Sequence, residues 1–467
     1  MSDLSILRDP SPSTARTVSA VIRLSIPAIL AEITSVAMQY IDSAMVGTLG
    51  EGASAAIGLI SSTTWLLGGL CVAIATGFSV QIAQYVGAGR EDLARNVFRQ
   101  SLLVTGIFGL IMGAIALGMS GPLPALLGGE ISIRADASAY LAVYALSLPL
   151  IQLRQNAAAA LQCTGDMKTP GMLHILLCLL NVIFNLILIF PTRSLPLGPV
   201  TLVLPGAGLG VVGAALGSAL SEALIALAML ARACLGSDKL ALSLGGSFRL
   251  RADCLTAAAR ISLPAALEHT VMCSAYVTAT GITAPLGKTD LAANALAVTA
   301  ESFCYMPGYG IGAASLTLVG QALGAGRKDL AKRLGRCSLL LGIITMSLSA
   351  VAMYLLAPWM MALLTPVPAV RESGAAMLRL VAFAEPFYAI SIVCADVLRG
   401  GGDTAVPGLI NLISMWGVRI SLSLLLVRPF GLAGIWYAMC ADLVVRGLLF
   451  LCRFLSGKWL NRRVISV

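Results

Sequence analysis

The sequence predicts an all-α integral membrane protein, in which twelve transmembrane helices form two parallel-repeat six-helix bundles around a central cavity. Hydrophobic residues make up 58% of the 467 residues and charged residues only 11%, and the mean hydropathy is +0.90. A soluble chain of this length does not reach such apolarity. Motifs of the first half also return in the second half at one offset, which indicates a duplicated folding unit.

The duplication is visible at matched landmarks along the chain. Pro264 follows Pro27, Gly324 follows Gly87 and Asp403 follows Asp166, each by 237 residues. The segment QYVGAGREDLA in the first half likewise returns as QALGAGRKDLA. Because this spacing is far longer than a solenoid repeat, each copy is expected to be a multi-helix half.

Long apolar runs predict the helices in order, since a span needs about 20 apolar residues. In the first half they lie near 19–46, 54–84, 93–119, 136–163, 170–191 and 207–234. In the second half they lie near 256–285, 291–321, 330–357, 373–399, 407–427 and 431–455. Six spans per copy is an even number, so the two copies begin on the same side and are parallel repeats.

We expect residues 1–235 to form the N-terminal bundle, 236–255 a cytoplasmic linker and 256–467 the C-terminal bundle. The linker is polar and rich in glycine, as connections between domains often are. The offset between the halves changes after the fifth helix, so the first half carries extra residues there. We assign them to a loop outside the membrane at 191–206, where proline and glycine are frequent.

The 31 Lys and Arg residues are distributed unevenly between the two predicted sides. Most fall at the two chain ends and in alternate connections, which places those parts on the cytoplasmic side of the membrane. The net charge of +9 is then explained by topology and by attraction to the inner leaflet, without a nucleic-acid partner.

Acidic residues inside the predicted spans are candidates for function, because an intramembrane charge costs about 2.5–3.5 kcal/mol. Eight qualify by position: Glu32, Asp42, Glu222, Glu268, Glu301, Glu385, Asp396 and Asp442. Four of these acids could form ion pairs with arginines. The possible pairs are Glu222 with Arg446, Glu385 with Arg379, Asp396 with Arg399, and Asp442 with Arg419. The acids outnumber the arginines, and unpaired carboxylates are available to bind protons or organic cations.

Polar residues also gather on single helical faces. His174, Asn181 and Asn185 share one stripe of the predicted fifth helix, either for function or as hydrogen-bonding contacts between helices. Glu301 has Tyr305 one turn later, and a carboxylate beside an aromatic ring suits a lipophilic cation. His269, which follows Glu268, is either a packed polar group, the interpretation we favour, or a proton relay.

Five prolines lie inside the apolar runs, at positions 27, 149, 264, 307 and 386. Proline removes a helical hydrogen bond and bends the helix axis. The kinks either act as hinges or are fixed packing features, and the sequence favours neither.

Several motifs together resemble the MATE (multidrug and toxic compound extrusion) family of secondary transporters. They are MQYIDSAMVG in the first helix, the paired GAGR loops, MPGYG beginning at Met306 and LRGGGDT beginning at Leu398. Their order and constant spacing extend the resemblance over essentially the whole chain. Membership would imply two bundles and export of amphipathic, often cationic compounds in exchange for H⁺ or Na⁺.

The resemblance also implies roles for individual residues. Asp42 matches the aspartate that the family uses for ion coupling, and would ligate Na⁺ if the protein is sodium-coupled. Asn181 and Asn185 resemble a polar pair of archaeal and bacterial members of the family, in which the second residue is often Asp. Because an amide cannot titrate, any proton-binding step in this chain would fall to Asp42 or another acid. Some relatives bind substrate through a glutamate of the seventh helix. The distance in sequence between that glutamate and the proline of the helix differs from the distance between Glu268 and Pro264, so the role does not transfer directly to Glu268.

We therefore expect a monomeric antiporter that works by alternating access and contacts organic cations and membrane lipid, without a cofactor. The expected ion-coupling residues are Asp42, Asn181 and Asn185, and the expected substrate-binding residues are Glu301, Glu268, Tyr305, Gln39 and His174. The alternative function is a lipid-linked oligosaccharide flippase, but its polyanionic cargo calls for basic residues where this chain has acids. An enzyme is not expected, because no clustered catalytic motif such as HExxH is present.

Overall fold

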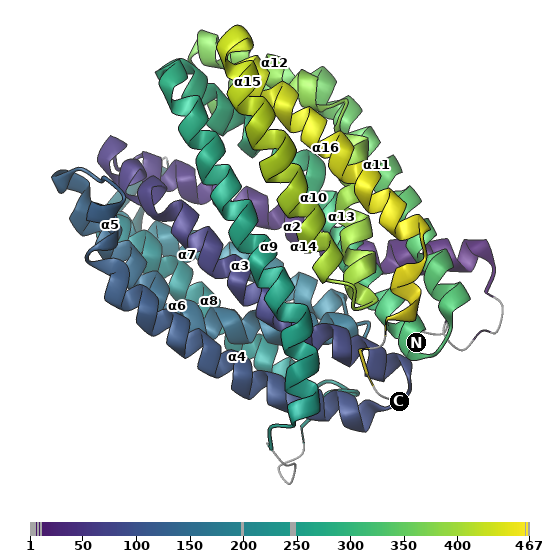
Figure 1. Ribbon diagram of the computed structural model, residues 1–467. Coiled ribbons are helices and arrows are strands. Elements are labelled where there is room, and N and C mark those ends of the chain that lie inside the picture. The colour runs from purple at the N-terminus through teal and green to yellow at the C-terminus, as the bar shows by residue number, and fades with distance from the viewer. Residues whose placement is uncertain are drawn as a thin grey trace.

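The computed structural model describes residues 6, 9, 12–197, 200–242, 249–462 and 464–465, without the side chains of 194–204. Long helices account for most of this chain (Figure 1). In the first half they are α2 (Thr14–Gly47), α3 (Glu51–Gly87), α4 (Glu91–Ser120), α6 (Ile131–Cys163), α7 (Lys168–Leu188) and α8 (Gly210–Leu235). The short helix α5 (Leu123–Leu126) lies between α4 and α6.

The second half repeats this order with two irregular spans. It contains α9 (Ala252–Thr283), α10 (Lys288–Gly324), α11 (Lys328–Leu364), the pair α12 (Pro368–Val381) and α13 (Glu385–Gly400), and α16 (Leu432–Leu455). Between α13 and α16, one span is built from α14 (Ala405–Leu412), the π-helical segment Ile413–Ile420 and α15 (Ser421–Phe430). The single turns Ala284–Leu286 and Lys458–Asn461 follow α9 and α16.

Among the described residues, nine helical segments are long and apolar enough to cross a membrane, and the α12–α13 pair makes a tenth. The remaining long helices, α9 and α10, have 32 and 37 residues, enough to span the hydrocarbon region at about 1.5 Å per residue. The predicted twelve-helix architecture is therefore confirmed. The α12–α13 span bends by 61° at a break just before Pro386, which lies in the first turn of α13, where proline is well tolerated.

The two halves form two groups of helices that also contact each other (Figure 1). Helix α2 of the first half packs along α10, and α9 of the second half packs along α3. Helix α2 begins and α16 ends on the same side of the molecule, which we call the terminal side (Figure 1). The expected linker 236–255 includes 243–248, outside the described residues, and α9 begins already at Ala252.

The extra residues of the first half form a feature that the sequence did not predict. Pro191–Leu197 (β1) and Val200–Ala207 (β2) pair as an antiparallel hairpin between α7 and α8. The density of proline and glycine in this segment predicted only a loop.

A pair of symmetric contacts closes the two halves together at the terminal side. The Gln84 side chain of α3 donates to the Gly400 carbonyl over 3.3 Å, and the Gln321 side chain of α10 donates to the Cys163 carbonyl over 2.6 Å. The two donors, Gln84 and Gln321, are 237 residues apart, and so are the two acceptors, Cys163 and Gly400. The same contact therefore occurs once in each direction between the duplicated halves. A Cβ at Gly87 or at Gly324 would also collide with the backbone of the other helix.

We expect the double substitution Gln84→Ala and Gln321→Ala to weaken this closure, because each removes a buried hydrogen bond between the halves. A single cysteine placed at Ser79, which lines the central cavity, should then react faster with a thiol reagent added from the terminal side. The same measurement in a background free of the native cysteines, with Gln155→Ala as the control glutamine, checks the effect. Equal labelling rates would show that these contacts do not hold the terminal side closed.

Candidate functional site

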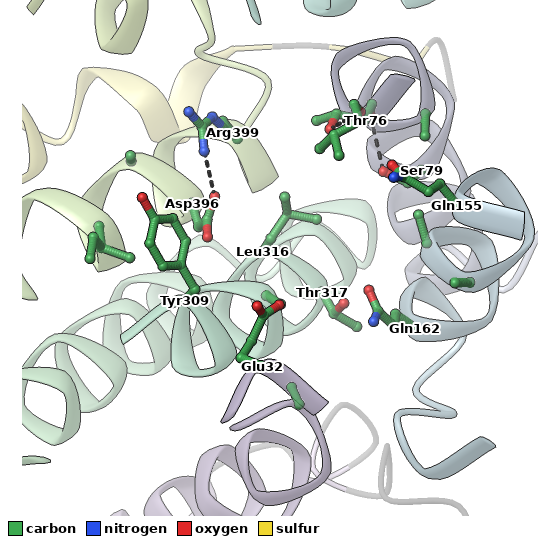
Figure 2. Close-up of a pocket in the computed structure, with 18 of the residues that line it drawn as sticks. Glu32, Thr76, Ser79, Gln155, Gln162, Tyr309, Leu316, Thr317, Asp396 and Arg399 are labelled. Atoms are coloured by element: carbon green, nitrogen blue, oxygen red, sulfur yellow. Dashed lines mark hydrogen bonds and ion pairs between the residues drawn. The ribbon is translucent and has the colours of Figure 1, made fainter. Parts of the chain in front are cut away.

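A cavity of about 440 Å³ lies between the two halves of the molecule. Helices α2, α3, α6, α7 and α8 of the first half and α9, α10, α13, α14 and α16 of the second half line it (Figure 2). Its volume falls in the range of about 300–1,000 Å³ that is typical of small-molecule sites. The predicted central cavity is therefore present, and both repeats contribute to its wall.

Ionisable side chains converge on this cavity, but most of them are already paired. Arg154 of α6 holds Glu222 of α8 with an Nε–Oε2 distance of 2.5 Å. Arg446 and Asp442, one turn apart on α16, form a second buried ion pair. An arginine paired with a carboxylate adds no net charge, so these contacts leave the cavity close to neutral at both places.

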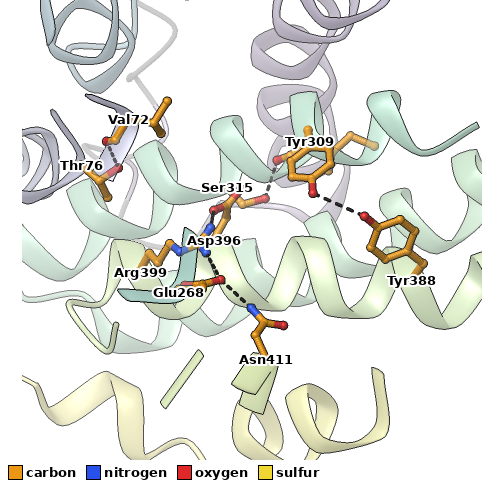
Figure 3. Close-up of polar contacts among 10 residues, drawn as sticks. Val72, Thr76, Glu268, Tyr309, Ser315, Tyr388, Asp396, Arg399 and Asn411 are labelled. Atoms are coloured by element: carbon orange, nitrogen blue, oxygen red, sulfur yellow. Dashed lines mark hydrogen bonds and ion pairs between the residues drawn. The ribbon is translucent and has the colours of Figure 1, made fainter. Parts of the chain in front are cut away.

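A third arginine, Arg399 of α13, bridges two acids in the cavity wall (Figure 3). Its guanidinium donates to Glu268 over 2.6 Å and to Asp396 over 2.8 Å. Asn411 donates to the same Glu268 oxygen over 2.5 Å, while the other oxygen of Glu268 is buried without a partner in the described structure. The Glu268 carboxylate is thus held in place by an ion pair at the edge of the cavity.

These pairings correct part of what the sequence suggested. The pair Asp396–Arg399 is confirmed, with the two residues three positions apart on α13. Glu222 pairs with Arg154 and not with Arg446, and Asp442 pairs with Arg446 and not with Arg419. Glu385 makes no ion pair with Arg379, whose guanidinium instead lies over the Tyr354 ring. An ion pair between residues one helical turn apart can be predicted from their spacing in the sequence. An ion pair between residues on different helices depends on how the helices pack.

Glu32 of α2 differs from the other acids of the cavity. Its carboxylate points into the cavity near Tyr309 and Thr317 of α10 (Figure 2). Within the part of the chain that the structure describes, no cationic side chain pairs with it, although Asp396 lies within electrostatic range. Glu32 therefore gives the cavity an uncompensated acidic group. The sequence marked it only as one of eight acids, because no motif surrounds it.

Asp42 lies in a separate polar cluster, formed where α2, α7 and α8 meet. The amide nitrogen of Asn185 donates to the Asp42 carboxylate over 2.8 Å and to the Asn181 side-chain oxygen over 3.0 Å. Asn181 in turn donates to the Ser218 hydroxyl over 2.9 Å. The structure therefore brings together all three residues that the sequence analysis grouped for ion coupling.

The chemistry of this cluster suits a small cation. The side-chain oxygen of Asn185 is buried and has no hydrogen-bond donor in the described structure. The Asp42 carboxylate and the Asn181 oxygen are hard oxygen ligands of the kind that Na⁺ prefers, and the carboxylate alone can accept a proton. The Asn185 amide nitrogen faces both oxygens and its own oxygen faces Gly217, so this amide would have to turn for its oxygen to join them around an ion. The cluster does not line the central cavity, so an ion here and an organic molecule there would occupy different places.

The expected substrate-binding residues are only partly in the cavity wall. His174 and Glu268 line it, whereas Gln39 is exposed on α2. Tyr305 lies behind the wall, where its ring contacts Tyr388 at 5.3 Å between centroids. Glu301 is buried farther from the cavity, among helices of the second half.

Gly217 of α8 positions the polar cluster, because a Cβ there would collide with the Asn185 side-chain oxygen. We expect Gly217→Ala to displace Asn185 and break its hydrogen bond to Asp42. Loss of one such bond to a charged group is worth about 1.5–3 kcal/mol. Thermal unfolding in detergent should show a lower midpoint for Gly217→Ala than for Gly281→Ala, whose Cβ would enter open space. Equal midpoints would contradict this positioning.

Comparison with known proteins supports the same architecture. The MatE family profile matches residues 27–187 and 264–425, and these two matches begin at the repeat-related prolines. The chain is 26% identical over 450 residues to "Probable multidrug resistance protein NorM" of Thermotoga maritima, covering 95% of this chain and 94% of that protein. It is 25% identical over 424 residues to "Uncharacterized transporter YisQ" of Bacillus subtilis, covering 90% of each.

Solved structures share the fold at low sequence identity. A MATE protein in complex with MaL6 superimposes with a TM-score of 0.88 at 20% identity, covering 98% of this chain and 99% of that one. A MOP superfamily transporter from Pyrococcus furiosus gives a TM-score of 0.87 at 20% identity, covering 99% of each chain. The two-lobe helical fold is therefore shared, and the profile match extends over most of both halves. The chain belongs to the MATE family of membrane transporters.

Proposed function

We propose that this protein is a secondary antiporter that exports amphipathic organic cations across a bacterial inner membrane in exchange for H⁺ or Na⁺. The observation that carries this proposal is a cavity, shared by two repeated halves, in which the Glu32 carboxylate has no ion-pair partner among the described residues and Glu268 and Asp396 share the single guanidinium of Arg399. A lipophilic cation gains both charge compensation and contact with the rings of Tyr309 and Tyr388 in such a site.

Ion coupling is assigned to the Asp42 cluster, which lies outside the cavity wall. Ion and substrate can drive transport only if they stabilise different states of the protein. Binding of H⁺ or Na⁺ at Asp42 neutralises a carboxylate between α2, α7 and α8 and favours one packing of these helices. Because α2 also carries Glu32, a shift of α2 changes the cavity and the substrate is released.

Alternating access follows from the contacts between the halves. Hydrogen bonds from Gln84 and Gln321 join the halves at the terminal side, which we assign to the cytoplasm from its basic residues. The state described here is therefore closed toward the cytoplasm. Rocking of the halves would break these contacts and open the cavity to the cytoplasm, with the protein acting as a monomer.

Reconstitution tests the proposal directly. Purified protein in liposomes should move a fluorescent lipophilic cation when a pH gradient or a sodium gradient is imposed separately, and not in protein-free liposomes. The gradient that drives transport identifies the coupling ion. Movement that continues at the same rate without any ion gradient would exclude antiport.

A further inference from the structure

Two acids that the proposed cycle leaves unused lie together in the second half of the molecule. Glu301 on α10 is 4% exposed, and Glu385, the first residue of α13, is 0% exposed. Glu385 lies beside the Cys304 thiol and within electrostatic range of Glu301. In the described structure neither acid forms an ion pair, and both carboxylate oxygens of Glu385 lack a hydrogen-bond donor.

The surroundings of this pair are apolar. Alanines and methionines of the second half pack there, among them Ala300, Met346 and Ala389. The polar groups within electrostatic range of the pair are the thiols of Cys304 and Cys440, the hydroxyl of Tyr305 and the guanidinium of Arg419. A lone ionised carboxylate in such a place is strongly disfavoured, and two adjacent ones repel each other.

Arg419 decides how many charges the pair can carry. Its guanidinium is buried, donates to the Met439 sulfur over 3.0 Å and lies 5.3 Å from the centre of the Tyr276 ring. It has no carboxylate at ion-pair distance in the described structure, yet it is within electrostatic range of Glu301. One negative charge on Glu301 therefore balances Arg419, and a second charge on Glu385 would have no counterpart.

We propose that Glu301 and Glu385 form a second proton-binding site, in the C-terminal half, in which Glu385 carries the proton in the state described here. The site is a proton site and not a metal site, because its other neighbours are thiols, ring hydroxyls and hydrocarbon, without the set of oxygen ligands that Na⁺ requires. The role of this site in transport rests on the function proposed above.

The proton on Glu385 is placed so that its loss can affect the cavity. Glu385 begins α13 directly after the 61° break, and the N-terminal end of this 16-residue helix lowers the cost of ionising the acid. Three tyrosines connect the pair to the cavity: Tyr305 contacts the rings of Tyr309 and Tyr388, and the hydroxyls of the last two are 3.4 Å apart (Figure 3). Both Tyr309 and Tyr388 line the cavity.

Infrared difference spectroscopy of the protein in lipid, recorded while the pH is raised, tests the proton site. We expect a carbonyl band of a buried carboxylic acid that disappears on deprotonation in the wild type and in Asp42→Asn. The band should be absent in Glu385→Gln and present in Glu372→Gln, which changes an exposed acid on the preceding helix α12. Spectra of Glu385→Gln that match the wild type at every pH would overturn the proposal.

Thermal unfolding provides a readout that does not depend on transport. Glu385→Gln exchanges one neutral group for another, so its unfolding midpoint should equal or exceed that of the wild type. Glu301→Gln leaves Arg419 without a balancing charge, so its midpoint should fall. The reverse order of the two variants would contradict the assignment of the proton to Glu385.

Transport separates this inference from the proposed function. If wild-type liposomes export the cation in response to a pH gradient, Glu385→Gln should move fewer protons per cation than Glu372→Gln. An unchanged ratio would remove the site from the transport cycle. If wild-type liposomes show no ion-driven export, the proposed function fails, while the infrared band still decides whether the proton is present.

Discussion

Asp42→Asn is expected to abolish ion-driven export while leaving binding of the organic cation in the central cavity intact. The carboxylate is the acid of a cluster whose other members, Asn181 and Asn185, are amides that cannot titrate. Replacing it removes both the proton acceptor and the charge that would hold Na⁺. Cation export under an imposed ion gradient should therefore fall to the leak of protein-free liposomes, and equilibrium binding of the same cation should keep the wild-type affinity.

The matched control for this experiment is Glu51→Gln, which neutralises an exposed acid at the start of α3. It should export at the wild-type rate. Full ion-coupled export by Asp42→Asn, at equal protein content per liposome, would show that coupling does not depend on this cluster. Loss of cation binding together with export would show instead that the substitution disturbs the cavity.

The grouping of Asp42 with Asn181 and Asn185 was predictable from the sequence because two independent signals agreed, and the role of the group in ion coupling stays a proposal. Asn181 and Asn185 are four residues apart, which places them on one face of α7. The motif around Asp42 resembles that of the MATE family, and the resemblance grouped Asp42 with the two amides. Packing of α2 against α7 provides the contact between Asp42 and Asn185, and helical spacing alone could not have supplied it.

The prediction for Glu301 and Tyr305 shows the limit of the same reasoning. These two residues share one stripe of α10 with Tyr309, and Tyr309 does line the cavity. The cavity, however, lies against the part of α10 that follows Pro307, at Tyr309, Ala313, Leu316 and Thr317. Glu301, which precedes the proline, is buried among other helices of the second half. Periodicity identifies a face of a helix but not the depth at which a cavity begins.

Ion pairs between helices were the least predictable feature of the site. Asp396–Arg399 and Asp442–Arg446 are one turn apart, a spacing that brings side chains together on any helix. Arg154–Glu222 joins α6 to α8, and Arg399–Glu268 joins α13 to α9. These partners are separated by long stretches of sequence, so only the folded arrangement shows which acids are neutralised. Glu32 became the candidate for substrate binding by this elimination.

Glu32→Gln is expected to weaken binding of a lipophilic cation by roughly tenfold or more, since an interaction with a charged group is worth about 1.5–3 kcal/mol. Glu268 and Asp396 of the wall share the guanidinium of Arg399, whereas Glu32 is the wall acid without an arginine partner among the described residues. The effect should depend on the charge of the ligand. A neutral analogue of the same shape should bind Glu32→Gln and the wild type equally well.

Equilibrium binding of a cationic dye and of its uncharged analogue to purified protein measures both effects. Glu32→Asp keeps the charge on a shorter side chain and should retain most of the affinity for the cation, whereas Gln155→Ala shortens a neutral side chain of the same wall and should affect both ligands alike. If Glu32→Gln lowered the affinity for the neutral analogue as much as for the cation, Glu32 would act through the shape of the cavity. Its charge would then not select cations, and the substrate class proposed here would be wrong.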